Sequence, residues 1–189
     1  MRSCFLMAGG ILASCVCFGQ SIWIGGIGGG MVTDEFSSQF VTSVSKRYVV
    51  GPELDIGLPL GLGFEADALY RREGFQSSDL TTHENGNSWQ FPLLLKYRLP
   101  FPLVKPVLEC GYAPRVINGP ISDYASPVSH GIVIGGGVQF GIGRLRLSPV
   151  VRYTHWNNVG VVVVFPNGPT IQSAQNQVDI LVGVGWKVR

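Results

Sequence analysis

The chain has 189 residues, a length suited to one domain, with 26 glycines, 14% charged residues and a formal net charge of +2. Apolar residues make up 46% of the sequence, which excludes intrinsic disorder, and the absence of a basic run or stripe argues against nucleic-acid binding. After the first twenty residues, glycine or charge interrupts each apolar segment before it reaches the length of a spanning helix. Short segments of alternating polarity predict an all-β chain instead.

Residues 1–19 are predicted to be a signal peptide, followed by a single domain over 20–189. A short positive start precedes the apolar stretch Phe5–Val16, and small residues then lead to a cleavage site after Gly19. An alternative is that Leu12–Cys15 is a lipobox, in which case Cys15 would be lipidated. Cleavage after Gly19 leaves Cys110 as a lone cysteine, so neither an internal disulfide nor a cysteine-based zinc site is expected.

Eight segments of period 2 follow, each long enough to cross a bilayer as a tilted strand. They cover residues 22–33, 47–58, 62–72, 88–99, 104–114, 130–140, 144–156 and 177–188. Short connections at 59–61, 100–103 and 141–143 alternate with long polar ones at 34–46, 73–87, 114–129 and 157–176. An even number of strands with alternating short and long connections predicts an antiparallel up-and-down transmembrane β-barrel with periplasmic turns and extracellular loops.

Charged residues fall on one face of these segments and apolar residues on the other. In the last segment, alternate residues from Val178 to Val188 are apolar, whereas Asp179 and Lys187 lie opposite. A water-soluble barrel such as a lipocalin would have its polar face outside. A lipid-facing charge near the bilayer midplane costs about 2–4 kcal/mol, so the continuous apolar face is predicted to face lipid. Outward aromatic residues form two levels, Phe64, Tyr97, Phe140 and Trp186 at one end and Tyr48, Tyr70, Trp89, Tyr112 and Tyr153 at the other, as interfacial girdles would.

The inward face predicts a lumen filled by ion pairs, because an eight-stranded barrel is just wide enough for side chains to fill it. The predicted lumen charge network comprises Glu53, Asp55, Glu65, Asp67, Glu109 and Asp179 with Lys96, Arg98, Arg144, Arg146, Arg152 and Lys187, joined by Arg71. We expect Asp55 and Glu65 to share a layer with Lys96, Arg144 or Arg146, and Glu53, Asp67 and Glu109 to lie nearer Arg152. A fixed interior network is favoured over a selectivity lining or proton path. No cofactor is expected.

The chain resembles the small outer-membrane β-barrel family, the eight-stranded OmpA/OmpX-like barrel domain. The segment Gly183–Val188 looks like the C-terminal signal of that family, although the chain ends in Arg189 where an aromatic is usual and has Leu181 where a polar residue is usual. The resemblance implies a location in the outer membrane of a Gram-negative (diderm) bacterium, contact with outer-membrane lipids, and help from the barrel assembly machinery during biogenesis.

The favoured function is non-enzymatic: a monomer with a structural or surface-interaction role, meeting an extracellular partner through four loops. The alternative is a lipid-modifying hydrolase, because the segment around His155 is similar to the His-x-Ser-Asn stretch of lipid A deacylases. Asn157 occupies the nucleophile position, however, and an amide cannot attack a carbonyl. A narrow pore is a third possibility. The apolar stretch Val161–Phe165 is predicted to extend its flanking strands as a hairpin, with an exposed apolar patch as the alternative.

Overall fold

The computed structural model describes residues 21–33, 41–43, 47–77, 83–119, 128–157, 161–163, 170–172 and 175–188. The predicted signal peptide, Cys15, Val164 and Phe165 lie outside these residues. The strands are β1 (Ser21–Met31), β2 (Val41–Ser43), β3 (Tyr48–Gly57), β4 (Leu62–Asp67), β5 (Leu69–Ser77), β6 (His83–Gln90), β7 (Leu93–Arg98), β8 (Val104–Asn118), β9 (Val128–Ile142), β10 (Leu145–Trp156), β11 (Val161–Val163), β12 (Thr170–Gln172) and β13 (Asn176–Lys187), with a 3₁₀ turn over Pro59–Gly61.

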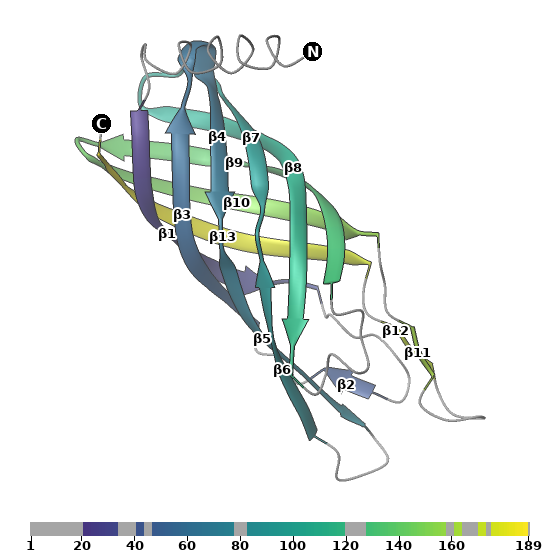
Figure 1. The fold of residues 1–189 in the computed structure, drawn as a ribbon. Helices are drawn as coiled ribbons and strands as arrows, with labels where there is room; N and C mark the ends of the chain where they lie inside the picture. Colours follow the sequence, from purple (N-terminus) through teal and green to yellow (C-terminus); the bar gives the residue numbers. More distant parts are fainter. Residues whose placement is uncertain are drawn as a thin grey trace, which may run out of the picture.

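Antiparallel pairing closes the sheet into a barrel (Figure 1). β1 pairs with β3 on one side and with β13 on the other, so the first and last strands of the wall meet. β4 and β5 together form one wall strand interrupted at Ala68, and β6 and β7 form another interrupted at Phe91 and Pro92. With these two composite strands and β1, β3, β8, β9, β10 and β13, the wall has eight strands. The all-β, eight-stranded antiparallel barrel predicted from the sequence is therefore confirmed.

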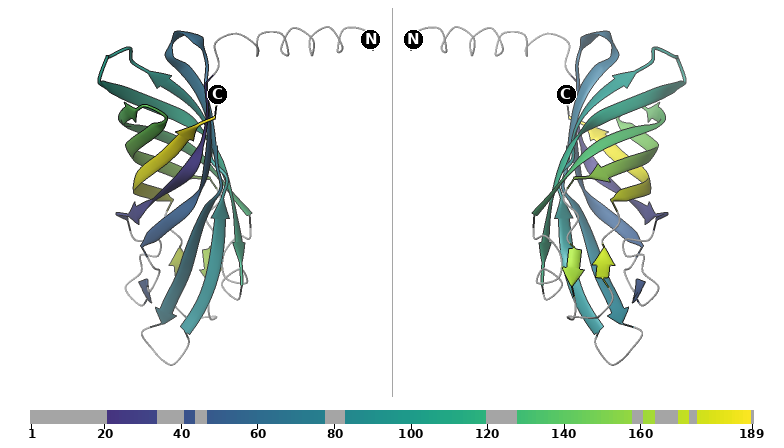
Figure 2. Two further views of the ribbon diagram at one scale, coloured as in Figure 1. Left: turned by 90° about the vertical axis from the view of Figure 1, so that its left-hand side faces the viewer. Right: turned by 90° about the vertical axis from the view of Figure 1, so that its right-hand side faces the viewer.

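The two ends of the barrel differ in how the strands are joined. We call the end with the short connections between β3 and β4, β7 and β8, and β9 and β10 the turn end, and the opposite end the loop end. β1 begins at the turn end, where Ser21 pairs with Gly57, and β13 finishes there, where Lys187 pairs with Trp23. The β5–β6 pair reaches farthest at the loop end (Figure 2).

Several strands extend farther at the loop end than the sequence predicts. β5 continues to Ser77 and β6 begins at His83, with pairs from Tyr70↔Trp89 to Gln76↔His83. β8 likewise runs to Asn118. The extensions of β5 and β6 are mostly polar, so they lack the apolar alternation by which a strand is recognised in sequence, and pairing between the two strands maintains them. Val161–Val163 pairs antiparallel with Thr170–Gln172 in a two-stranded sheet separate from the barrel wall.

Side chains alternate between an apolar outer face and a mostly polar interior. In β13 the side chains of Ile180, Val182 and Trp186 are exposed, whereas Asp179 and Leu181 are buried. Large exposed hydrophobic residues recur on the other wall strands, including Leu95, Leu108, Ile134 and Val151. A surface of this kind is stable only when apolar surroundings cover it. No helix within the described residues is long and apolar enough to span a membrane.

The interior also contains two apolar clusters that the sequence analysis did not predict. One cluster consists of Ile27, Val49, Leu69, Val150 and Leu181, and the other of Leu94, Ala113, Val133 and Trp156. Both are made of inward-facing residues of the wall strands, so apolar packing adds to the polar contacts that fill the lumen.

Candidate functional site

Nine buried or nearly buried charged side chains meet inside the barrel, and we call them the central network. The acids are Glu53 and Asp55 of β3, Glu65 and Asp67 of β4, and Glu109 of β8; the bases are Lys96 and Arg98 of β7, and Arg146 and Arg152 of β10. The two acids of β3 are two residues apart, as are those of β4, so strand geometry places each pair on the same inward face.

Arg152 connects three strands across the lumen. Its Nη2 lies 2.5 Å from Glu65 Oε1, its Nη1 2.7 Å from Asp67 Oδ2, and its Nε 2.5 Å from Glu109 Oε1. The arginine side chain is only 2% exposed. The planar guanidinium has five donors in a fixed fork, which suits it to hold several carboxylates at once. Arg152 therefore ties β10 to both β4 and β8 through the interior.

A second group of ion pairs lies nearer the turn end and is centred on Asp55. Arg98 Nη2 donates to Asp55 Oδ1 at 2.5 Å, and Arg146 Nη1 lies 3.0 Å from Asp55 Oδ2. Arg146 also pairs with Glu53 through Nη2. Asp55 has no exposed surface, so its charge is balanced entirely by side chains of the barrel interior.

Lys96 joins the two groups. Its ammonium pairs with Glu65 and lies 3.6 Å from Asp55 Oδ2 and 3.7 Å from Glu109 Oε2. Because Glu65 also binds Arg152, the contacts run without a gap from Asp55 to Glu109. The central network is therefore one connected set of ion pairs, in which the loss of any member removes at least one buried ion pair.

A smaller network lies toward the loop end. Arg71 Nη2 pairs with Asp179 Oδ1 at 3.0 Å, and Gln177 donates to the other oxygen of Asp179. Trp156 Nε1 donates to Gln177 Oε1 at 3.0 Å, and the Arg115 guanidinium lies 4.3 Å from the Trp156 ring centroid. Sequence reasoning missed Arg115 because the fifth predicted segment ended at residue 114, yet continuing its alternation by one residue would have placed Arg115 inside.

Two glycines make room for the acids. A Cβ atom at Gly135 would lie 2.6 Å from Glu109 Oε1 and 2.9 Å from the Val151 carbonyl oxygen. A Cβ atom at Gly183 would press against the Glu53 carboxylate. These two inward glycines therefore leave room for carboxylates of the central network.

Two solved structures share this architecture, although no family model and no curated protein matches the sequence. The outer membrane protein OprG from Pseudomonas aeruginosa superposes with a TM-score of 0.61 at 12% identity, covering 90% of this chain and 95% of that chain. Neisserial surface protein A (NspA) gives a TM-score of 0.55 at 15% identity, covering 89% and 99%. The chain has the fold of an eight-stranded outer-membrane β-barrel. The predicted OmpA/OmpX-like fold is thus confirmed, and its apolar outer face fits the outer membrane.

Four of the predicted lumen charges lie outside the central network, and two of these, Arg144 and Lys187, are exposed. Arg144 occupies the β9–β10 turn and Lys187 ends β13, and both are exposed at the rim of the turn end. Both residues are in the inward-facing phase of their strands. They lie at the open end of the barrel, however, so their side chains are not enclosed. Glu53 also differs from expectation, because it pairs with Arg146 and not with Arg152. Asp179 pairs with Arg71 in the separate network toward the loop end.

Carboxylate oxygens of Glu53, Asp55 and Glu65 lie within 4.8 Å of one another, a spacing that a metal ion could bridge. In the outer-membrane barrel, however, cationic side chains already occupy these oxygens: Arg146 contacts the first two residues and Lys96 the last two. A divalent cation would have to displace both bases. The arrangement is suited to holding β3, β4, β7 and β10 together.

His155 lies on the outer face of β10, as its place in the alternation predicts. Its Nδ1 is 2.9 Å from Asn176 Oδ1, and the Tyr153 hydroxyl donates to the same oxygen at 2.7 Å. Asn157 follows β10 and is exposed. Within the described residues, the hydrogen bond of His155 leads to an amide, which cannot serve as the nucleophile of an ester hydrolase.

Proposed function

We propose that this outer-membrane barrel is a monomer with a closed interior and a non-enzymatic role in envelope structure or surface interaction. The observation that carries the proposal is Arg152, whose guanidinium binds carboxylates from β4 and β8 across the lumen. A side chain held by three ion pairs at 2.5 to 2.7 Å blocks the interior at that level.

The energetics of the central network support a closed lumen. Breaking one buried ion pair by removing a partner typically costs about 3–5 kcal/mol, and each ion passing the barrel would have to break several. An eight-stranded barrel also has no spare diameter beside its side chains. The apolar clusters around Leu181 and Leu94 occupy further parts of the interior.

The loop end supports a role in surface interaction. β5 and β6 extend to Ser77 and His83, and β2 adds to this extension through Val41↔Ser77 and Ser43↔Phe75. The β5–β6 pair thereby reaches beyond the other strands of the wall at the loop end (Figure 2). Loops that are positioned by a rigid scaffold are common sites of recognition, so an extracellular partner would meet the protein here.

A planar bilayer experiment tests the closed lumen. We expect the folded protein to insert without producing stable conductance steps, because the central network blocks the ion path. A porin of large diameter, inserted by the same procedure, shows that the assay detects open barrels. Reproducible single-channel steps from the purified wild-type protein would contradict the closed lumen.

An acyl-release assay tests the non-enzymatic role. Incubating the folded protein with lipid A is expected to release no fatty acid, because the hydrogen bond of His155 leads to Asn176 rather than to a nucleophile. Release that the wild-type protein produces and a His155→Ala variant does not would establish the hydrolase instead. A Val151→Ala variant, changed on the same outer face of β10 but away from His155, serves as the control.

A further inference from the structure

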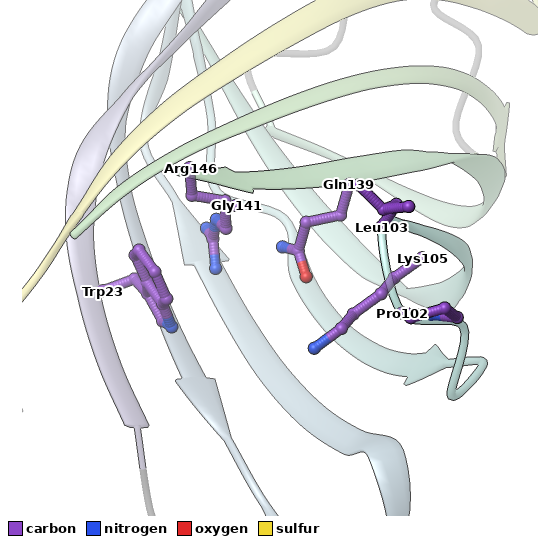
Figure 3. Close-up of a pocket in the computed structure, with 7 residues that line it drawn as sticks. All are labelled: Trp23, Pro102, Leu103, Lys105, Gln139, Gly141 and Arg146. Carbon is purple, nitrogen blue, oxygen red and sulfur yellow. The ribbon is translucent and has the colours of Figure 1, made fainter. Parts of the chain in front are cut away.

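A pocket of about 140 Å³ opens at the rim of the turn end, on the turn-end side of the central network (Figure 3). Its lining residues are Trp23, Pro102, Leu103, Lys105, Gln139, Gly141 and Arg146. Arg146 forms its inner boundary, since the same guanidinium pairs with Glu53 and Asp55 of the central network. The pocket therefore ends at the ion pairs and does not continue through the barrel.

We propose that this pocket binds a small organic anion, a carboxylate on a short apolar body, from the periplasmic side. The site does not depend on the function proposed above, and the two can fail separately. One wall of the pocket, with cationic and amide side chains, would bind the carboxylate. An apolar wall would contact the body of the ligand.

The polar wall consists of Lys105, Gln139 and Arg146. Figure 3 shows the nitrogen-bearing ends of these side chains directed into the same space. Arg146 is 2% exposed, and its Nε is buried without a hydrogen-bond partner within the described residues. A buried donor without a partner costs free energy that an anionic ligand would recover. Among the described residues, Gln139 makes one long hydrogen bond, from Nε2 to Ser148 Oγ at 3.4 Å.

The net charge of the pocket comes from Lys105. Glu53 and Asp55 already balance Arg146, whereas Lys105 is exposed and forms no ion pair within the described part of the chain. Arg144 and Lys187 are exposed at the same rim and raise the local positive potential. An anion arriving from the periplasm is therefore attracted to the pocket mouth and can pair with the Lys105 ammonium.

The apolar wall and the volume limit the ligand to a small body. Trp23, Pro102 and Leu103 supply apolar surface, and the Arg146 guanidinium lies 5.1 Å from the Trp23 ring centroid, which fixes the ring. A cavity of about 150 Å³ accepts a molecule the size of benzene, and this pocket is of similar volume. A monocarboxylate with a single ring or a short aliphatic chain matches both walls.

Calorimetric titration of the folded wild-type protein in detergent with benzoate tests the proposal. We expect saturable binding of benzoate and binding at least about tenfold weaker for benzamide, which has the same shape without the charge. Inorganic phosphate tests the apolar wall and is expected to bind more weakly than benzoate. Equal binding of benzoate and benzamide, equal binding of phosphate, or no saturable binding of benzoate would overturn the proposal.

Two variants with the same change of charge locate the site. Lys105→Gln keeps most of the side chain and is expected to weaken benzoate binding about tenfold. Arg144→Gln removes one positive charge from the same rim outside the pocket lining and is expected to change the affinity less than about twofold. Unheated gel mobility identical to that of the wild type shows that both variants fold. Wild-type affinity in Lys105→Gln, or an equal loss in Arg144→Gln, would refute a specific site.

Discussion

Replacing Arg152 with methionine is expected to lower the free energy of unfolding by about 3–5 kcal/mol, as is typical when one partner of a buried ion pair is removed. The substitution leaves Glu65, Asp67 and Glu109 facing one another without the guanidinium that lies within 2.7 Å of each. Methionine fills a similar volume, so the effect reports on charge more than on packing. Urea unfolding of the barrel in lipid vesicles measures it.

Arg72→Met is the matched control for this substitution. Arg72 is an exposed arginine of β5, and replacing it is expected to change stability by less than about 0.5 kcal/mol. Arg152→Lys should recover only part of the loss, because one ammonium cannot reproduce three contacts of a planar fork. A loss below about 1 kcal/mol in Arg152→Met would mean that the three carboxylates do not depend on Arg152.

Replacing Val151 with arginine is expected to cost about 2–4 kcal/mol, the range for a basic residue on the lipid face near the bilayer midplane. Val151 is 48% exposed on the outer face near the middle of β10. The next residue, Arg152, carries the same side chain on the inner face, where it is buried. The comparison therefore tests which face of β10 meets lipid, with unfolding in vesicles as the measurement.

Ile142→Arg provides the corresponding control at the rim. Ile142 is 79% exposed at the end of β9, so an arginine there reaches the interface and should cost only about 0–1 kcal/mol. If Val151→Arg were as mild as Ile142→Arg, the apolar face would not be facing the hydrocarbon core.

Alternation predicted the faces of the strands because it depends only on the twofold period of a β-strand. Glu65 and Arg152 were assigned to the interior on this basis, and the structure places both there. The lengths of the connections could also be predicted from the sequence. The three short connections indicate which consecutive strands pair as hairpins. The fold class, the strand number and the lipid-facing surface all follow from these two signals.

Alternation does not predict how far along the barrel axis each inward side chain lies. Arg144 and Lys187 share the inward phase with Arg146, but they lie where the lumen opens and are exposed. Which inward charges form ion pairs depends on the stagger between strands, and closure of the barrel sets that stagger. The pairing of Glu53 with Arg146 could therefore not be predicted from the face on which each residue lies. Arg115 was missed because the strand continues past the apolar segment that marked it.

The central network also bears on the order of assembly. Its five acids all lie in β3, β4 and β8, whereas Arg146 and Arg152 belong to β10, close to the end of the chain. Until β10 docks, those five acids have only Lys96 and Arg98 of the network to offset them. Arg152 is 87 residues from Glu65 and 43 from Glu109, so these contacts are non-local, and contacts of this kind slow folding. A barrel that lacks β10 and β13 therefore holds five acids and two bases of the central network, and the docking of β10 supplies Arg146 and Arg152. We therefore expect repulsion among the acids to favour closure of the barrel.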